Sequence, residues 1–390
     1  MVKYRMKILI NVVNARNIGG GFQVVLNFIL KTQEYARSDV DWYYAVSERL
    51  DGSMGEGFKA KVREDHYYIY PNQPDFRGTY RRVKRELREL EDKIKPDVIF
   101  SPLSPGYFFF KQKEVMRFAN AWSTNATSYA WKTLPIRPKI RAKIYNIMQR
   151  ALLRRAKYII TQTETVKGGL LRVTGLPENR VKVVPNVLPA ILQDIDPTSL
   201  DRDSKWVNVA AVGGQMPHKN FEIIPEVLRI LKEKYQLSTV RFHTTLPAES
   251  GVWWRIENGL KKYGVEENVM NHGCLKLTEL ADLYRHCRFC FLPTVLETFS
   301  ASTIEAMYFD LKTVASDLPF NTEVMKDASL YFEPMKPESA AEKLALVIGD
   351  KSLQDDLSYK MKERLNNYID FRKYFDNTVD FLIQVGNNAL

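Results

Sequence analysis

The sequence predicts an α/β protein made of two domains, each built on a parallel sheet. Short apolar runs typical of buried strands alternate with amphipathic helical patterns along the whole chain, the order expected of parallel sheets built from strand–helix–strand units. A length of 390 residues allows two domains of ordinary size. A change of charge near the middle of the chain favours two domains with different kinds of partner.

The predicted strands are apolar runs that lie between turn signals. They fall at 6–13, 42–46, 97–101, 115–121 and 158–162 in the first half, and at 207–212, 240–244, 289–293, 313–316 and 330–332 in the second. Helices are predicted at 22–36, 79–95 and 137–157, and another begins near Ser300. The first helix follows a glycine-rich turn over 19–21.

The first domain is predicted over 1–187 and the second over 206–390. The stretch between them, 188–205, is polar, contains prolines and has no periodicity, so we expect it to be the linker. The C-terminal helices, around 339–385, are expected to pack on the second domain, and a return to the first domain is left open. Residues 1–185 carry 34 Lys and Arg against 17 Asp and Glu, whereas the remainder carries 23 against 29.

The composition is that of a globular protein, with 45% hydrophobic and 26% charged residues. No apolar run approaches the roughly 20 residues of a membrane-spanning helix, and the N-terminus lacks the pattern of a signal peptide. We therefore expect a cytoplasmic location, with peripheral binding to the cytoplasmic face of a membrane left open. Met1 and Met6 are both possible starts.

Three cysteines, Cys274, Cys287 and Cys290, argue for a reducing compartment and against a disulfide framework. The Cys287-x-x-Cys290 spacing, with His272 and His286 nearby, suggests zinc. A second Cys or His pair at finger spacing is absent, and cysteines in an apolar run commonly act as small hydrophobes. We expect no metal site.

Two predicted helices carry much of the basic charge. Arginines and glutamates surround an apolar stripe over 79–95, which is typical of a surface helix. The polar face over 137–157 has no acid, and its apolar face collects Ile140, Ile144, Ile147, Met148, Ala151 and Leu152. Two interpretations stay open for this helix: an ordinary core helix, or one that binds an anionic membrane surface or a phosphorylated lipid. No nucleic acid is expected, because a stacking platform, finger or helix-turn-helix signature is absent.

Two glutamates eight positions apart, Glu297 and Glu305, are the strongest candidate site residues. The first follows the predicted strand 289–293, and the second lies in the first turns of the next helix. Both can face the crevice outside the carboxyl ends of the strands, where open α/β sheets bind ligands. Helix N-termini at that edge attract phosphate through free N–H groups and the helix dipole.

Three blocks of the second half resemble the retaining GT-B glycosyltransferases of family 4. The stretch 293–317 is similar to that family's E-x7-E signature, with Glu297 and Glu305 as its two acids. The run 212–220 is similar to its strand–loop–Lys-Asn phosphate motif, and 268–284 is similar to the block between the two.

Two stretches of the first half, 159–164 and 183–186, resemble the family's last N-domain strand and its domain crossing. The motifs cover about half of the chain, and the rest matches by the order of its elements. The resemblance implies the GT-B fold, in which two Rossmann-like domains face a central cleft. The resemblance implies transfer of a hexose from a UDP- or GDP-sugar to a hydroxyl, with retention at the anomeric carbon and without a metal or another cofactor. It also implies a glycan or lipid-linked acceptor, as in surface polysaccharide assembly.

The resemblance assigns roles to particular residues. Lys219 and the N–H groups at the helix start would stabilise the leaving diphosphate, usually the largest electrostatic contribution to catalysis. Glu297 would hold the donor sugar and face the developing oxocarbenium ion, and Glu305 would accept hydrogen bonds from the ribose. The other donor-binding positions implied are Gly213, Gly214, Gly273, Thr298, Phe299, Ser300, Gly20 and Gly21.

The chain also departs from the family pattern. A small E-G-F-G turn is replaced by 297–300 (ETFS), and Gly214 stands where the family often has a phosphate-binding arginine. Asn120 stands near the position of a common N-domain histidine, and we expect it to take that residue's catalytic hydrogen bond. The leaving phosphate could then accept the acceptor's proton.

Simpler readings exist for each residue and for the whole chain. A helix capping box over 302–305 would explain Glu305, and Lys219 alone would be a surface lysine. The alternatives for the whole chain are a nucleotide-sugar epimerase or phosphorylase on the same fold, or a catalytically silent nucleotide-sugar-binding protein.

Overall fold

The computed structural model describes residues 4–15, 20–35, 37–71, 79–104, 108–200 and 205–390. The chain forms two compact units. Unit 1 consists of 1–124, 144–186 and 372–390, and unit 2 of 125–143 and 187–371. Each unit contains one sheet whose described strand pairs are parallel, so the predicted α/β class is confirmed.

The sheet of unit 1 has seven strands in the order β3-β2-β1-β4-β5-β6-β7. Their bounds are β1 Met6–Val12, β2 Val40–Ser47, β3 Tyr67–Tyr70, β4 Val98–Ser104, β5 Glu114–Phe118, β6 Tyr158–Thr161 and β7 Val181–Val183. Apolar β1 residues such as Ile8 and Leu9 are fully buried. The chain changes direction across the sheet between β1 and β4, as in a doubly wound fold.

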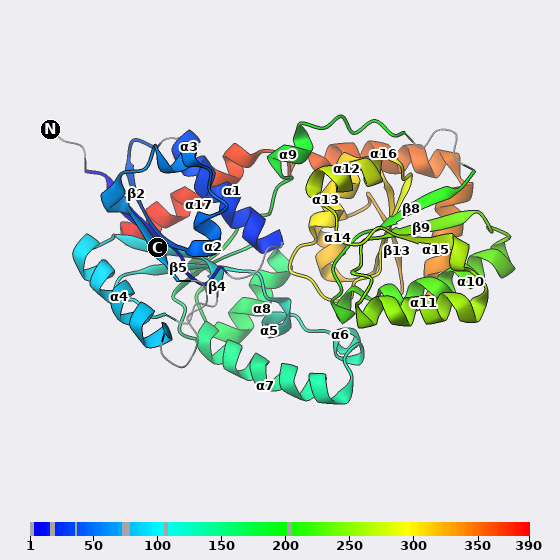
Figure 1. The fold of residues 1–390 in the computed structure, drawn as a ribbon, viewed down its shortest axis with the longest axis horizontal. Helices are drawn as coiled ribbons and strands as arrows, with labels where there is room; N and C mark the ends of the chain where they lie inside the picture. The colour runs from blue at the N-terminus through cyan, green and yellow to red at the C-terminus, as the bar shows by residue number, and fades with distance from the viewer. Residues whose placement is uncertain (1–3, 16–19, 36, 72–78, 105–107, 201–204) are drawn as a thin grey trace. The chain divides into compact units, whose positions relative to one another are not determined.

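Helices accompany the strands of unit 1 (Figure 1). They are α1 Gly20–Glu34, α2 Glu48–Asp51, α3 Glu56–Lys59, α4 Thr79–Ile94, α5 Ala121–Thr124 and α8 Glu164–Thr174, with 3-10 turns η1 Glu64–His66 and η2 Glu178–Arg180. The C-terminal helix α17, Phe371–Gly386, packs on α1, where the Phe375 and Phe28 ring centroids are 5.1 Å apart. Lys113 Nζ caps this helix by donating to the backbone oxygens of Val385 and Gly386.

The sheet of unit 2 has six strands in the order β10-β9-β8-β11-β12-β13. Their bounds are β8 Val207–Ala211, β9 Val240–Thr244, β10 Val269–Asn271, β11 Phe289–Leu292, β12 Lys312–Ser316 and β13 Leu330–Phe332. The change of direction lies between β8 and β11, in the middle of the sheet. One large apolar core surrounds this sheet.

The helices of unit 2 are mostly amphipathic, with their apolar faces in that core. They are α6 Ser128–Lys132, α9 Ala190–Gln193, α10 Ile224–Tyr235, α11 Gly251–Tyr263, α12 Leu277–Arg285, α13 Ala301–Tyr308, α14 Pro319–Met325, α15 Pro337–Gly349 and α16 Lys351–Leu365. Short 3-10 turns are η3 Pro217–Lys219, η4 Phe221–Ile223 and η5 Glu266–Asn268.

The stretch expected to be the linker lies against unit 2 where the structure describes it. It contains α9, and Leu188 and Leu192 are buried in the core of the unit. The Leu188 backbone N–H donates to the Tyr368 backbone oxygen at 2.7 Å. Residues 201–204 of this stretch, with Asp201 and Asp203, lie outside the described residues.

Every predicted strand is present among the described residues, but the prediction missed three strands and extended one by three residues. The missed strands are β3, β7 and β10. The predicted strand 115–121 ends at Phe118, because the chain turns at Asn120 and begins α5 at Ala121.

Helix α7, Ile136–Leu153, is one continuous helix (Figure 1). Its apolar stripe is exposed. Its inward residues are Asn146, Gln149 and Leu153. The exposed side chains include Ile136, Ile140, Ile144, Ile147 and Met148, with Ile147 71% exposed. The core-helix interpretation is therefore wrong for this stripe. Among the described residues, none of the helices combines the length and apolar character needed to cross a membrane.

Candidate functional site

The best candidate site lies at the carboxyl ends of β8 and β11 in unit 2. These strands are neighbours at the point where the strand order reverses, so the loops that follow them diverge and leave room for a ligand. The loop after β8 leads to η3, which ends at Lys219. The loop after β11 leads through Glu297 to the start of α13.

Lys219 and Glu297 form an ion pair at this edge. Lys219 Nζ lies 2.5 Å from Glu297 Oε1, and the two side chains are only 20% and 17% exposed. Both charges are therefore partly shielded from water, which strengthens their fields compared with a surface pair. The sequence motifs predicted both residues as site residues, and the structure places them in contact.

Hydrogen bonds join the two loops that carry this ion pair. The His218 backbone oxygen accepts from the Val295 N–H at 2.8 Å and from Thr294 Oγ1 at 3.2 Å. Asn220 Nδ2 donates to the Pro293 oxygen at 3.3 Å. These bonds fix the distance between Lys219 and Glu297 through backbone rather than through long side chains alone.

His218 is held neutral beside the ion pair. Burial lowers its pKa to about 4, and the nearby Lys219 charge acts in the same direction, against the opposing effect of Glu297. A neutral imidazole adds no second cation at this point, so Lys219 supplies the positive charge of η3.

Glu305 lies one helix turn inside α13 and is 5% exposed. Its Oε2 accepts a hydrogen bond from Tyr284 Oη of α12 at 2.7 Å. Burial raises the pKa of Glu305, while this hydrogen bond and the Lys219 charge lower it. The capping-box interpretation is wrong, because the helix begins at Ala301 after Ser300 and the Glu305 carboxylate binds Tyr284.

The predicted glycines of unit 2 have different local surroundings. A Cβ at Gly213 would lie 3.0 Å from the Phe221 ring, so only glycine fits without a small shift of that ring. Gly214 has open space at that position. Gly273 has φ +69°, a conformation that favours glycine.

The three residues between Glu297 and α13 are buried. Thr298, Phe299 and Ser300 are 7%, 6% and 4% exposed. Phe299 packs edge-on against Tyr368, with ring centroids 5.8 Å apart. Their side chains anchor the turn, so a ligand at this edge would meet mainly its backbone.

The predicted residues of unit 1 have local roles of their own. Asn120 Oδ1 accepts from the Trp122 N–H at 3.2 Å at the start of α5. Gly20 and Gly21 begin α1, and a Cβ at Gly21 would lie 3.9 Å from Leu103. Gly19 lies outside the described residues. The structure thus groups Lys219, Glu297 and Glu305 within unit 2, and Asn120, Gly20 and Gly21 belong to the other unit.

Three residues that support the site had no role in the sequence prediction: Tyr284, Thr127 and Asn220. Thr127 caps α6 and donates from Oγ1 to the Val295 oxygen at 3.1 Å, across 168 residues of chain. Asn220 adopts φ +57°, a left-handed conformation in which Asn is enriched. Asn220 and Tyr284 lie at the ends of the motif stretches 212–220 and 268–284, whereas Thr127 had no sequence signal.

The cysteine pair considered as metal ligands, and the aspartates Asp39 and Asp41, have other partners or surroundings. Cys287 and Cys290 are free and buried, as expected of small hydrophobes, and Cys274 is exposed. Asp39 pairs with Arg37 at 3.0 Å, and Asp41 accepts from Tyr43 Oη. Among the described residues, no group of three or more His, Cys, Asp or Glu could hold a metal ion.

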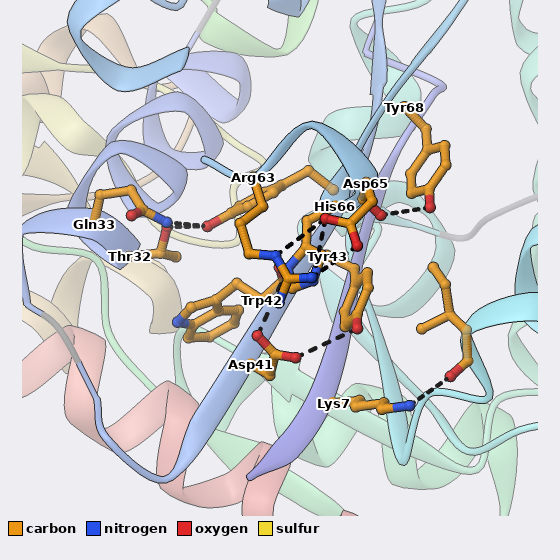
Figure 2. Close-up of polar contacts among 12 residues, drawn as sticks. Lys7, Thr32, Gln33, Asp41, Trp42, Tyr43, Arg63, Asp65, His66 and Tyr68 are labelled. Carbon is orange, nitrogen blue, oxygen red and sulfur yellow. Dashed lines mark hydrogen bonds and ion pairs between the residues drawn. The ribbon is translucent and has the colours of Figure 1, made fainter. Parts of the chain in front are cut away.

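A second polar cluster lies at the amino end of the unit 1 sheet (Figure 2). Arg63 makes two hydrogen bonds to Asp65, and Tyr43 Oη donates to Asp41 at 3.3 Å. The His66 ring stacks on Tyr43 with centroids 3.9 Å apart. A cavity of about 380 Å³ adjoins this cluster. It opens at the strand end opposite to the usual ligand edge, and aspartate already matches the Arg63 charge, so the Lys219–Glu297 edge is the better candidate.

Two family models match the chain, one in each half. The model of Glycosyl transferases group 1 matches residues 199–364, and the model of Glycosyltransferase Family 4 matches residues 18–189. Among curated proteins, the chain is 23% identical over 238 residues to the O-antigen chain mannosyltransferase RfbU of Salmonella typhimurium. That alignment covers 61% of this chain and 62% of the relative, so the chain spans less than two thirds of the relative's length.

Solved structures share the fold over nearly the whole chain. A glycosyltransferase from Rickettsia africae ESF-5 matches with a TM-score of 0.73 at 13% identity, covering 98% of this chain and 99% of that one. Anabaena Alr3699/HepE in complex with UDP matches with a TM-score of 0.69 at 13% identity, covering 97% and 100%. The lipopolysaccharide outer core galactosyltransferase WaaB matches with a TM-score of 0.61 at 12% identity, covering 97% and 99%.

Proposed function

Because the chain belongs to the group 1 glycosyltransferases, we propose that it transfers a hexose from a UDP- or GDP-sugar to a hydroxyl, with retention at the anomeric carbon. The observation that carries this proposal is the Lys219–Glu297 ion pair at the strand-order reversal of unit 2. Glu305 lies close enough for the Lys219 charge to affect its pKa. A cation at this edge suits the diphosphate of a nucleotide-diphosphate sugar, and two carboxylates suit the hydroxyls of its sugar and ribose.

The proposed chemistry follows the charges. The bond between the anomeric carbon and the β-phosphate oxygen breaks, and Lys219 with the backbone N–H groups before α13 stabilises the leaving diphosphate. Glu297 faces the developing oxocarbenium ion. The acceptor oxygen then bonds to the same face of the sugar and gives its proton to the departing phosphate. Because Lys219 supplies the positive charge, the scheme needs no metal or cofactor. Asn120, Gly20 and Gly21 remain proposed contacts of the sugar and diphosphate.

A nucleotide-release screen tests the donor part of the proposal. The full chain is incubated with UDP- and GDP-hexoses, with and without glycan or lipid-diphosphate acceptors. We expect release from one donor, and we expect Glu297→Ala to lower turnover by about 10²–10³-fold while nucleotide affinity stays within a few-fold. Glu342→Ala, at an exposed ion pair of α15, is the matched control.

Each other outcome of this screen has a clear meaning. Equal turnover of Glu297→Ala and the unchanged chain would refute the role of Glu297. Conversion of the donor without an acceptor would indicate an epimerase. Binding of nucleotide without any turnover would indicate a nucleotide-sugar-binding protein.

We propose further that the acceptor is a lipid-linked or surface-polysaccharide glycan at an anionic cytoplasmic membrane face. Helix α7 supports this. On a helix with 3.6 residues per turn, Arg137 and Arg141 lie on one side of its exposed isoleucine stripe, and Lys143 and Arg150 lie on the other. The names of RfbU and WaaB place those relatives in O-antigen and lipopolysaccharide synthesis.

The energetics of α7 favour a lipid surface over water. Burying one isoleucine side chain gains about 1.5–3 kcal/mol, and Ile136, Ile140, Ile144 and Ile147 are all more than half exposed. Basic residues beside an apolar stripe add attraction to anionic headgroups.

Co-sedimentation with vesicles tests this second part. We expect binding to phosphatidylglycerol-containing vesicles at low salt and none to neutral ones. Replacement of Ile140, Ile144 and Ile147 by serine should weaken binding by at least about tenfold, and Ile69→Ser, at another exposed isoleucine, should not. A chain that ignores anionic vesicles at low salt ends the membrane proposal.

A further inference from the structure

Three polar side chains form a hydrogen-bonded row across the sheet of unit 2. His243 Nε2 lies 2.9 Å from Asn208 Oδ1, and His243 Nδ1 lies 2.9 Å from His272 Nε2. Asn208 and His243 are buried, and His272 is half-buried. The fold explains the row: parallel register places Ala210 and Met270 beside His243, so Asn208 on β8, His243 on β9 and His272 after β10 all point to one face.

Both imidazoles of the row are neutral at neutral pH. Burial lowers the pKa of His243 to about 4, and the neighbouring basic groups act in the same direction: His272, Arg241 on its own strand, and His286 at the end of α12. Burial also lowers the pKa of His272. A neutral imidazole has one N–H donor and one bare nitrogen acceptor.

The hydrogen bonds of the row determine which nitrogen of His272 is unprotonated. The Asn208 oxygen can only accept, so the His243 proton is on Nε2 and its Nδ1 accepts. His272 must then donate from Nε2. His272 Nδ1 is left as a hydrogen-bond acceptor.

His272 lies at the same strand ends as the Lys219–Glu297 pair. It follows β10, and its backbone N–H donates to the Thr244 oxygen at 2.8 Å. Asn271 fixes the neighbouring loop, because its Oδ1 accepts from the Leu246 N–H and its Nδ2 donates to the Leu246 oxygen. Thr245 Oγ1 accepts from the Gly213 N–H at 3.2 Å. The loops after β8, β9 and β10 therefore form one connected edge, to which His272 contributes a side chain that is not fully buried.

We propose that His272 reads the nucleobase of the donor, with His243 and Asn208 as positioning residues that hold its tautomer. The proposal rests on the proposed donor site. A bare Nδ1 accepts a hydrogen bond from the imino N–H of uracil (N3–H) or guanine (N1–H). The corresponding ring nitrogens of cytosine and adenine are themselves acceptors, so they would face Nδ1 without a proton between them. His272 thus selects UDP- and GDP-sugars against CDP- and ADP-sugars.

Calorimetric titration of the full chain with UDP, GDP, CDP and ADP tests the proposal. The preferred one of UDP or GDP should bind at least about tenfold tighter than CDP and ADP. This ratio corresponds to the free energy of one hydrogen bond and of the avoided contact between two acceptor nitrogens. His272→Phe, which keeps a ring without the acceptor, should remove that preference and leave CDP and ADP binding unchanged. His243→Phe should weaken the preference by freeing the tautomer, and His286→Phe is the control.

A pH series separates base reading from a structural role. Protonation of Nδ1 removes the acceptor, so the ratio of UDP or GDP affinity to CDP affinity should fall as pH decreases through the pKa of His272. This decrease should be absent in His272→Phe. Comparing two diphosphates cancels the titration of the phosphates themselves.

The failures of the two proposals are distinguishable. Nucleotides that bind equally well whatever the base, or a preference that survives His272→Phe, overturn base reading and leave the donor site intact. A chain that binds none of the four nucleotides overturns both proposals.

Discussion

Each unit contains a glutamate whose pKa is raised by desolvation, Glu305 buried and Glu114 half-buried, and the two have different neighbours. Glu305 in α13 accepts from Tyr284 and feels the charge of Lys219. Glu114, the first residue of β5, accepts from Ser101 Oγ at 2.5 Å, and burial with nearby Glu91 raises its pKa to about 7. Glu305 follows the carboxyl edge of its sheet, whereas Glu114 begins a strand at the amino edge.

The comparison shows that a perturbed carboxylate does not by itself mark a functional site. Desolvation acts in the same direction on both acids. Of the two, Glu305 is the one whose pKa a cation, Lys219, lowers, and it is the one that lies where parallel sheets bind ligands. We therefore assign Glu114 to the structure of unit 1 and Glu305 to the proposed donor site of unit 2.

Removing Lys219 should have the largest effect, because this cation distinguishes the two acids. We expect Lys219→Ala to lower the turnover number by about 10²–10³-fold, since the leaving diphosphate loses its main positive charge and Glu297 loses its partner. Lys219→Arg should retain part of the activity. Steady-state kinetics with the donor found in the screen measure both, and Lys261→Ala, at an exposed pair of α11, is the control. A Lys219→Ala chain with full turnover would contradict the donor assignment.

The glutamine variants of the two acids compare the units directly. Glu305→Gln should raise the donor KM by about 10–100-fold, because a carboxylate binds hydroxyls more strongly than an amide does. Glu114→Gln should change kcat and KM less than about twofold, because a neutral amide resembles the protonated acid that burial favours there. Equal losses in both variants would mean that the comparison does not separate function from structure.

Most of the fold could be predicted from the sequence because central strands are apolar runs. The fully buried β11 is FCFL, whereas the missed strands β3, β7 and β10 expose part of their few residues. All three lie at the edges of their sheets. An edge strand pairs with a neighbour on one side only, so it can be short and partly polar. In these three strands neither length nor hydrophobicity distinguishes the strand from a loop.

The candidate site could be predicted where its residues follow strands in short motifs, as Lys219 and Glu297 do. Tyr284 and Thr127 could not, because their roles come from contacts 21 and 168 residues away. The sequence showed the isoleucine stripe of α7, but not whether the stripe faces the core or the solvent. A helical pattern gives the angle between two faces and does not say which one meets the core.

The smallest expected effect is on stability, through Glu114. Its pKa is about 7 in the folded protein and near 4.5 in the unfolded chain, so the folded state binds the extra proton between these values. The free energy of unfolding should therefore decrease as pH rises from about 4.5 to 7, and the loss should be complete above 7. Partial exposure of the carboxyl reduces the effect to about 1–2 kcal/mol.

Urea unfolding of the unchanged chain and of Glu114→Gln at pH 5, 6, 7 and 8 measures this effect. Glu305 and other acids contribute equally to both proteins, so the difference between the two curves isolates Glu114. Glu114→Gln should become the more stable of the two as pH rises, by about 1–2 kcal/mol at pH 8 relative to pH 5, without a change in activity. Parallel curves would mean that Glu114 is ionised in the folded protein at little cost in stability. Burial would then not raise the pKa of Glu114 as it raises that of Glu305.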